Sequence, residues 1–336
     1  MSDEDLALPE GTIGDVIAAG PGFVAVGGGF DASSQTPLAA IWTSGDGEDW
    51  QRAPLEGEAA LGRVAAITTG GPGLVAVGSH CCPDRAAVWV SADGTGWSRV
   101  ADQDAFAGAA MTAVTSWAGG LVAVGCDAEL ECSGPAIWLS GDGQAWERVE
   151  IGNELGTAYL GDVTASGSVL VAVGAPDPAG PAPGAILVSL DGQVWTAADV
   201  PRGAISLAGV AAGRTGVVAT GTAFDEAAGR EAMLIFTSTD GAEWLSVESE
   251  AFARGSGDDI LQGPFGFVAV GQVVRSGAGV AASWWSLDGR SWERSVPGPQ
   301  GLMSAVTADA SGRLVAVGSA STSSVTQPSV WLSGGE

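Results

Sequence analysis

The sequence contains no lysine, one histidine and one tyrosine, and these absences exclude several kinds of chemistry. A zinc site built on two or three histidines is impossible, and a Ser-His-Asp triad could use only His80. No apolar run approaches the roughly 20 residues that a membrane-spanning helix needs. The first ten residues, MSDEDLALPE, have neither the basic start nor the apolar run of a secretory signal peptide.

Positive charge is also scarce. The chain has 39 acidic residues and 13 basic ones, all of them arginine, so its net charge is −26. A surface this negative repels nucleic-acid phosphates and anionic lipid head groups. It suits cations or basic partners, and it also suits simple solubility. We therefore expect a monomer with basic or cationic ligands, no nucleic-acid partner and no membrane span.

The four cysteines form two close pairs, Cys81 with Cys82 and Cys126 with Cys132. An even number of cysteines in an acidic, loop-rich chain favours an oxidising compartment, so we expect a secreted or cell-envelope protein. A disulfide between Cys126 and Cys132 would close a hairpin and leave Cys81 and Cys82 to bond each other. Crossed disulfides between the two pairs are an alternative, and a metal site that adds His80 is another.

Glycine is abundant, with 53 residues, and one unit of sequence recurs seven times. The first marker of the unit is VAVG or a close variant, and its copies end at Gly27, Gly78, Gly125, Gly174, Gly221, Gly271 and Gly318. The second marker is the box S-x-D-G-x-x-W, which begins at Ser44, Ser91, Ser140, Ser189, Ser238 and Ser286. The box ends six residues later at Trp50, Trp97, Trp146, Trp195, Trp244 and Trp292.

A period of 40 to 50 residues with several short strands is typical of a β-propeller. In the first unit we expect four strands, named a to d, over residues 14–19, 22–28, 39–44 and 49–54. Eleven of the 13 tryptophans stand at two recurring positions, one in strand c and one in strand d, where large rings suit the wide outer gap between blades. We predict one all-β domain over 1–336, a seven-bladed propeller of four-stranded antiparallel blades. The approximate blades are 11–54, 60–100, 108–150, 157–200, 204–248, 257–296 and 302–336.

The seventh unit ends in its strand c at Glu336. The stretch EDLALPEG at 4–11 resembles EDWQRAPLEG at 48–57, with Leu6 in place of Trp50. We therefore predict that residues 4–9 form strand d of the seventh blade, which would leave the ring without free sheet edges.

The box resembles the Asp-box, or BNR, repeat of sialidase-like propellers, S-x-D-x-G-x-x-W, with one residue fewer between Asp and Gly. The resemblance implies that the box is a structural hairpin on the face away from an active site. It also implies that its aspartates bond nearby backbone amides: Asp46, Asp93, Asp142, Asp191, Asp240 and Asp288.

The resemblance raises sialidase-like glycoside hydrolase or lyase activity as the alternative function. That chemistry needs three arginines around a carboxylate and a tyrosine with a glutamate partner. The family's F/Y-R-I-P motif is absent, although Tyr159 has Glu154 close in sequence. Arginines of the variable segments are Arg63, Arg85, Arg202, Arg230, Arg254 and Arg275.

Three aspartates, Asp15, Asp162 and Asp259, stand at equivalent positions of strand a, where we expect a ring around a central channel. The other units carry Ala65, Ala113, Gly209 and Ala305 there. The three carboxylates could hold a cation such as calcium, bind a basic side chain or serve glycoside hydrolysis. They could equally be a hydrated channel lining, so we assign no cofactor, no metal ligand and no catalytic residue.

The b–c connections and the d–a linkers vary most between units and should share one rim of the ring, where variable loops on a rigid scaffold usually bind. The rim candidates are Phe30, Arg85, Phe106, Tyr159, Phe224, Arg230, Phe252 and Arg275. We predict non-catalytic binding of a protein segment or glycan at this rim and at the acidic channel mouth. A purely structural module is the third interpretation.

Overall fold

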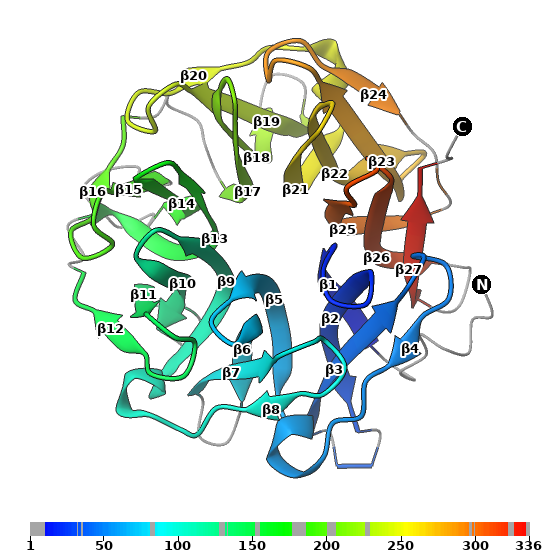
Figure 1. The fold of residues 1–336 in the computed structure, drawn as a ribbon. Helices are drawn as coiled ribbons and strands as arrows, with labels where there is room; N and C mark the ends of the chain where they lie inside the picture. Colours follow the sequence, from blue (N-terminus) through cyan, green and yellow to red (C-terminus); the bar gives the residue numbers. More distant parts are fainter. Residues whose placement is uncertain are drawn as a thin grey trace.

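The computed structural model describes residues 11–31, 33–34, 36–80, 85–127, 132, 134–151, 155–176, 186–199, 206–225, 229–295, 298, 300–321 and 326–333. These residues form seven antiparallel sheets arranged radially around a central axis, as Figure 1 shows. The protein is an all-β seven-bladed propeller, and strand a of each blade lies nearest to the axis.

The strands of the first three blades follow chain order from the axis outward. Blade 1 comprises β1 (Gly11–Ile17), β2 (Phe23–Phe30), β3 (Pro37–Ser44) and β4 (Gln51–Arg52). Blade 2 comprises β5 (Arg63–Gly70), β6 (Gly73–His80), β7 (Arg85–Ser91) and β8 (Ser98–Arg99). Blade 3 comprises β9 (Ala109–Trp117), β10 (Gly120–Asp127), β11 (Pro135–Ser140) and β12 (Glu147–Val149).

The remaining blades repeat this order. Blade 4 comprises β13 (Thr157–Ser166), β14 (Val169–Pro176), β15 (Ile186–Ser189) and β16 (Thr196–Ala197). Blade 5 comprises β17 (Ser206–Gly213), β18 (Gly216–Asp225), β19 (Arg230–Ser238) and β20 (Leu245–Ser246). Blade 6 comprises β21 (Gly255–Gly263), β22 (Gly266–Arg275), β23 (Ala278–Ser286) and β24 (Glu293–Ser295).

Blade 7 shows three strands among the described residues: β25 (Gly301–Ala308), β26 (Leu314–Ser321) and β27 (Thr326–Leu332). The fourth strand predicted from residues 4–9 lies outside the described residues. The innermost strands nevertheless close the ring, because β25 of the last repeat contacts β1 of the first. Each sheet therefore has a neighbour on both faces, which a sheet with two apolar faces requires.

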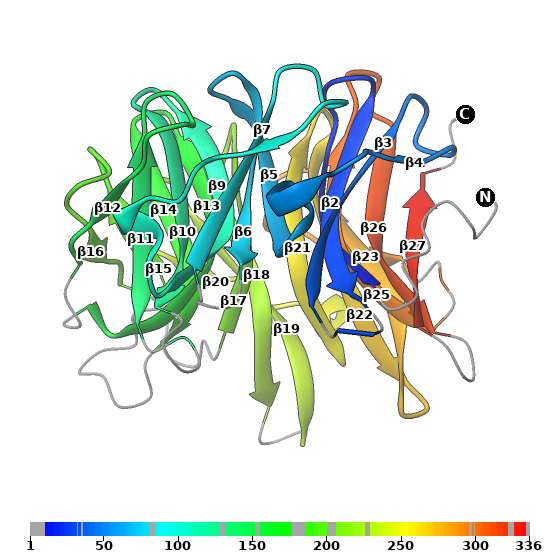
Figure 2. The ribbon, with the colours of Figure 1, turned by 90° about the horizontal axis from the view of Figure 1, so that it is seen from below.

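The connections define two faces of the ring, seen edge-on in Figure 2. The a–b turns and the boxes lie on one face. The b–c connections and d–a linkers lie on the other, where the long hairpin of β18 and β19 projects furthest. Among the described residues, three linkers contain a single 3-10 turn each: η1 (Gly57–Ala60), η2 (Asp104–Phe106) and η4 (Glu250–Phe252).

Every blade carries a bulge at the same place in strand a, where its pairing with strand b shifts by one residue. The bulge sets Asp15, Asp162 and Asp259 opposite the valine of their VAVG markers. In blade 2 this register belongs to Ala66, so the sequence-based choice of Ala65 is wrong by one residue. The bulge is common to all seven blades and does not cause this error, because the twelve residues that separate Asp15 from Gly27 also separate Ala66 from Gly78.

The six boxes form one repeated hydrogen-bonded hairpin. In blade 3 the hydroxyl of Ser140 accepts the amide of Gly143 at 2.8 Å, and Asp142 accepts the amides two and three residues further on. The indole of Trp146 donates to the Gly143 carbonyl at 3.1 Å. Gly143 has a φ of +76°, in the region that favours glycine. The other five boxes make the same contacts, so all six aspartates act as turn formers.

In blades 2, 3 and 6 the tryptophan of strand c joins the blade to the linker that leads into it. Trp89 and Trp284 are fully buried, and their indole N–H groups donate to the carbonyls of Ala59 and Ala251 at 2.9 and 2.8 Å. Burying a ring of this size while satisfying its single donor gives a large stabilisation. The outer part of the ring therefore depends on indole packing between sheets.

Adjacent tryptophans in blade 6 test this packing. Trp284 is fully buried, whereas the next residue, Trp285, is 45% exposed. We expect Trp284→Ala to lower the free energy of unfolding by about 3–5 kcal/mol through loss of packing and a cavity. Trp285→Ala should lower it by about 1 kcal/mol or less. Denaturant unfolding of both variants checks this, and equal losses would contradict the assignment of stability to the inter-blade ring.

Candidate functional site

The three aspartates of the predicted ring link neighbouring blades through the backbone. The Oδ1 of Asp15 accepts the amide of Val16 at 2.7 Å, and its Oδ2 accepts the amide of Ile67, on β5 of the next blade, at 2.8 Å. Asp162 and Asp259 make the same pair of bonds, with Val163 and Val210 and with Ile260 and Val306. Each carboxyl thus satisfies a donor on the free inner edge of the following sheet.

These carboxyls hold their protons unusually tightly. Burial raises the pKa of Asp162 to about 8, with further increases from the charges of Asp259 and Asp15, against the lowering effect of its two amide donors. Burial and the charge of Asp259 raise the pKa of Asp15 to about 7. Burial raises the pKa of Asp259 and of the neighbouring Asp258 to about 6. The charge of Asp259 raises the pKa of both Asp15 and Asp162, so these carboxyls are coupled electrostatically.

The described residues do not assemble these aspartates into a metal site. No group of three or more His, Cys, Asp or Glu side chains in the described part of the chain is placed to hold a metal ion. Both oxygens of each aspartate already accept backbone amides. The geometry therefore fits links between blades better than ligands of a shared cation.

Two of the predicted rim aromatics are buried, so these two assignments are wrong. Phe106 and Phe252 lie within the 3-10 turns η2 and η4 and belong to the hydrophobic core. Phe252 packs edge-on against Trp292 with ring centroids 6.3 Å apart. The linker turns its phenylalanine inward because the wide gap between blades has room for a ring. Phe30 is 50% exposed at the end of β2.

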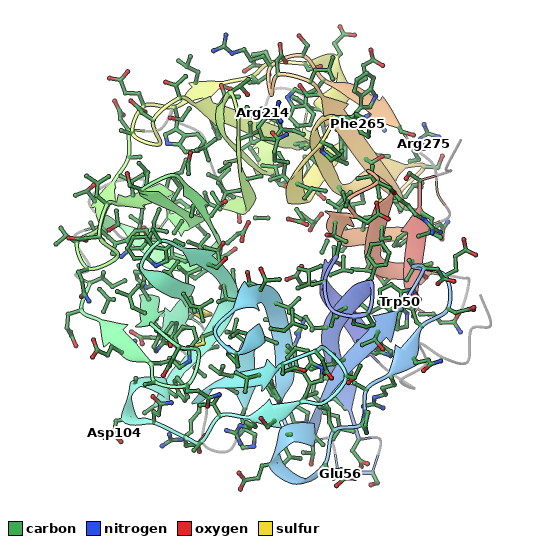
Figure 3. The ribbon with its side chains drawn as sticks, in the orientation of Figure 1. Trp50, Glu56, Asp104, Arg214, Phe265 and Arg275 are labelled. Carbon is green, nitrogen blue, oxygen red and sulfur yellow. A yellow bond between two sulfur atoms is a disulfide. The ribbon has the colours of Figure 1, made fainter. Side chains whose placement is uncertain are left out.

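The polar rim candidates come from four different blades. Arg85 lies 3.9 Å from Asp102 and donates to a linker carbonyl, that of Gln103. The hydroxyl of Tyr159 is half-buried and lies 3.1 Å from the hydroxyl of Ser206. Arg230 and Arg275 are exposed at the b–c hairpins of blades 5 and 6, and Figure 3 places Arg275 across the ring from blade 3.

Several predicted site residues fall outside the described part of the chain. These are Cys81 and Cys82, Glu154, Arg202, and the side chain of Phe224. The arrangement of a tyrosine, its glutamate and three arginines that sialidase chemistry needs is therefore not assembled by the described residues.

The rim of blade 3 contains a groove that sequence reasoning missed. Its volume is about 500 Å³, and it is lined by Ala107, Gly108, Asp127, Pro135, Arg148, Val149, Glu150 and Ile151. These residues come from the d–a linkers on either side of the blade, the ends of its b–c connection and strand d. A disulfide between Cys126 and Cys132 ties the same b–c connection.

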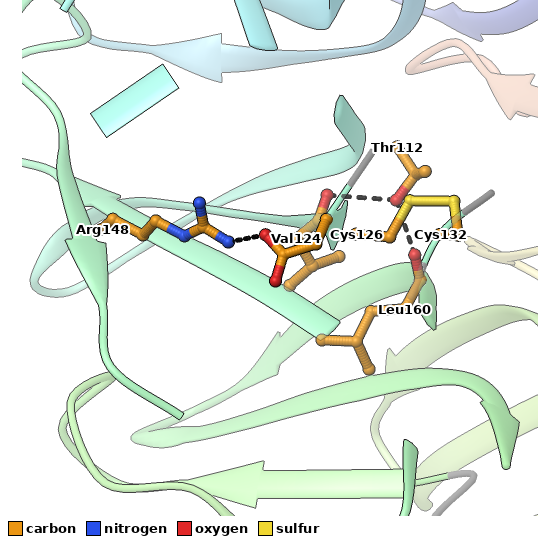
Figure 4. Close-up of a disulfide and its surroundings, with 7 residues drawn as sticks. Thr112, Val124, Cys126, Cys132, Arg148 and Leu160 are labelled. Carbon is orange, nitrogen blue, oxygen red and sulfur yellow. Dashed lines mark hydrogen bonds and ion pairs between the residues drawn. A yellow bond between two sulfur atoms is a disulfide. The ribbon is translucent and has the colours of Figure 1, made fainter. Parts of the chain in front are cut away.

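Arg148 makes several contacts within the groove, and Figure 4 draws its guanidinium in an ion pair. Its guanidinium forms an ion pair with Asp127, donates to the carbonyl of Ala107, and lies 5.7 Å from the ring centroid of Trp138. Beside the disulfide, Thr112 donates to a carbonyl of the next blade at 2.7 Å. There is little indication of this groove in the sequence. Arg148 follows Glu147, and the same Glu-Arg pair recurs in blade 6 as Glu293–Arg294, so the pair does not distinguish blade 3.

No protein-family model matches the chain, and no curated protein matches it in sequence. Solved structures with a similar fold include Sqt1 from Chaetomium thermophilum, at 12% identity and a TM-score of 0.54, covering 92% of this chain and 80% of that one. The Pyrococcus horikoshii acylaminoacyl peptidase gives 11% identity and a TM-score of 0.60, covering 98% and 52%. The Trypanosoma rangeli sialidase, solved with sialic acid, gives 14% and 0.51, covering 96% and 54%.

At these identities the likeness shows the fold alone, and this chain spans about half the length of the peptidase and sialidase chains. The three neighbours carry different names on one architecture, so the propeller does not specify the activity. No helix in the described part of the chain is long and apolar enough to cross a membrane.

The raised pKa values of the axis aspartates predict a stability that falls with rising pH. Each folded-state pKa lies above the ordinary value of 3.8, so the folded protein holds more protons than the unfolded chain between about pH 4 and 8. The stabilisation is complete below about pH 4 and is lost as the pH rises through 6 to 8. One such carboxyl contributes a slope of up to about 1.4 kcal/mol per pH unit.

Denaturant unfolding at pH 5 and pH 8 checks this prediction. Asp162→Asn should reduce the loss of stability between the two pH values. The control is Asp142→Asn in a box, where amide hydrogen bonds lower the pKa, so its removal should leave the slope in this range unchanged. A slope unaffected by Asp162→Asn would show that this carboxyl is not the titrating group.

Proposed function

We propose that the protein is a non-catalytic binding propeller that recognises a protein segment at the b–c and d–a rim, with the blade 3 groove as its site. The observation that supports this most directly is the groove itself. Its volume of about 500 Å³ lies within the range of ligand sites, and it opens on the face where the loops vary. The disulfide and the Arg148–Asp127 ion pair hold its walls, so little ordering is needed on binding.

The lining favours a peptide over a sugar. It offers the guanidinium of Arg148, the carboxylates of Asp127 and Glu150, and the partly exposed side chain of Ile151. Charged and apolar groups in this mixture match side chains of a protein segment. Sugars stack on exposed aromatic faces, and none of the residues that line the groove is aromatic. A glycan ligand is therefore the less supported form of the proposal.

The disulfide supports a setting in an oxidising compartment, which agrees with a secreted or cell-envelope protein. The acidic ring at the axis supports the proposal less, because each of its carboxyls is engaged with backbone amides. Glycoside hydrolase activity lacks a supporting arrangement, since the hydroxyl of Tyr159 is paired with Ser206 in the described structure.

Selection from a phage-displayed library of random peptides tests the proposed site. We expect the recovered peptides to lose about tenfold in affinity for Arg148→Ala, because removing one charge-assisted contact costs about 1.4 kcal/mol or more. The measurement is fluorescence anisotropy with the selected peptides.

Arg294→Ala is the matched control, because Arg294 donates to the linker carbonyl of Ala253 as Arg148 does to that of Ala107. This variant should bind the peptides as the unmodified protein does. Equal effects of the two variants would contradict the groove as the site. Turnover of aryl-glycosides that is lost in Tyr159→Phe would favour the enzyme, and binding confined to a glycan array would replace the peptide.

A further inference from the structure

Large apolar side chains are exposed on the box face of blades 4 to 6, opposite the proposed rim. Leu190, Val194, Leu245 and Leu287, which we call the box-face patch, are exposed by 72, 65, 66 and 70%. Phe265, in the a–b turn of blade 6 and labelled in Figure 3, is 73% exposed on the same face. Exposed apolar residues that gather on one side of a monomer indicate an interaction surface.

Two hollows lie within the box-face patch. The larger, of about 380 Å³, lies between blade 4 and the box of blade 5 and is lined by Val169, Val188, Ser189, Leu190, Asp191, Val194, Thr196, Asp240 and Ala242. The smaller, of about 130 Å³, lies between blade 5 and the box of blade 6 and includes Leu245. Asp240 lines both, so the hollows adjoin.

The fold does not require these apolar residues, because other copies of the same hairpin lack them. The residue after the box serine is Gly45, Ala92 and Gly141 in blades 1 to 3 but Leu190 and Leu287 in blades 4 and 6. The residue after the box tryptophan is Leu245 in blade 5, where blade 2 has Ser98. All six hairpins nevertheless make the same hydrogen bonds.

Carboxylates surround the box-face patch. Asp191 and Asp240 line the larger hollow, and Asp288 and Glu243 line the smaller one together with one cation, Arg290. Backbone amide hydrogen bonds lower the pKa of Asp191, Asp240 and Asp288, so these groups are ionised at neutral pH.

A second copy of the chain is a poor occupant of this surface. It has 39 acidic and 13 basic residues, so its negative charge would be repelled by the carboxylates around the patch. A cationic segment with apolar side chains complements both features of the surface.

We propose that the box-face patch binds a partner-protein segment that combines leucine-like side chains with arginine or lysine. The apolar side chains would occupy the hollow between blades 4 and 5, and the cations would lie against Asp191 and Asp240. This surface is separate from the blade 3 groove, so the proposal for either surface can be contradicted without affecting the other.

The probe is a labelled twelve-residue peptide of alternating leucine and arginine, compared with one in which serine replaces leucine. Fluorescence anisotropy at physiological salt should show at least about tenfold tighter binding of the leucine peptide, because burial of two or more leucines supplies that difference. Equal affinity for the two peptides would overturn the proposal, since charge alone would then explain binding.

A patch variant locates the site. Leu190→Ala, Val194→Ala, Leu245→Ser and Leu287→Ala each introduce a residue that another blade carries at that position: Ala92, Ala145, Ser98 and Ala92. The combined variant should reduce binding of the leucine peptide about tenfold, to the level of the serine peptide. Phe30→Ala, on the opposite face, should leave binding unchanged. If the patch variant binds the leucine peptide as tightly as the unmodified protein, the assignment of this partner is wrong. It is also wrong if sedimentation velocity shows that the unmodified protein is a dimer and the patch variant a monomer.

Discussion

The structure depends on the packing of each sheet between two others. A blade of four short strands exposes two apolar faces, and only a neighbour on each side removes both from water. The ring meets this requirement for every blade, because the innermost strands of the first and last repeats are in contact. Indole rings fill the wide outer gaps, while valine, alanine and glycine fit near the axis. The hydrogen bonds from Asp15, Asp162 and Asp259 join blade to blade where the sheets converge.

The two faces of the ring differ in structure because the repeats build one face from a constant hairpin and the other from variable connections. The box face is built from one hairpin used six times, with the same serine, aspartate and tryptophan contacts. The opposite face carries connections that share neither length nor composition, and blade 3 forms its groove there. The proposed functions follow this division: a shaped groove arises where loops vary, whereas the box-face patch arises from a few substitutions on an invariant hairpin.

The fold could be predicted because the residues typical of strands, turns and outer tryptophans recur in the same order in each repeat. The ring positions of Asp15, Asp162 and Asp259 followed from the same register. The hydrogen bonds from these carboxyls to the next blade could not be predicted, because each joins residues about 50 positions apart in the sequence. Phe106 and Phe252 were misassigned since a linker residue can turn into the gap as readily as out to solvent. The blade 3 groove depends on the relative placement of two linkers and a b–c connection, which no single stretch of sequence records.

Calorimetry of thermal unfolding tests the central claim, that no blade is stable without its neighbours. Mutual dependence predicts one cooperative transition, with the calorimetric and van't Hoff enthalpies equal for the whole chain. Several transitions, or a van't Hoff enthalpy that is a small fraction of the calorimetric one, would show that blades unfold separately and would contradict the account.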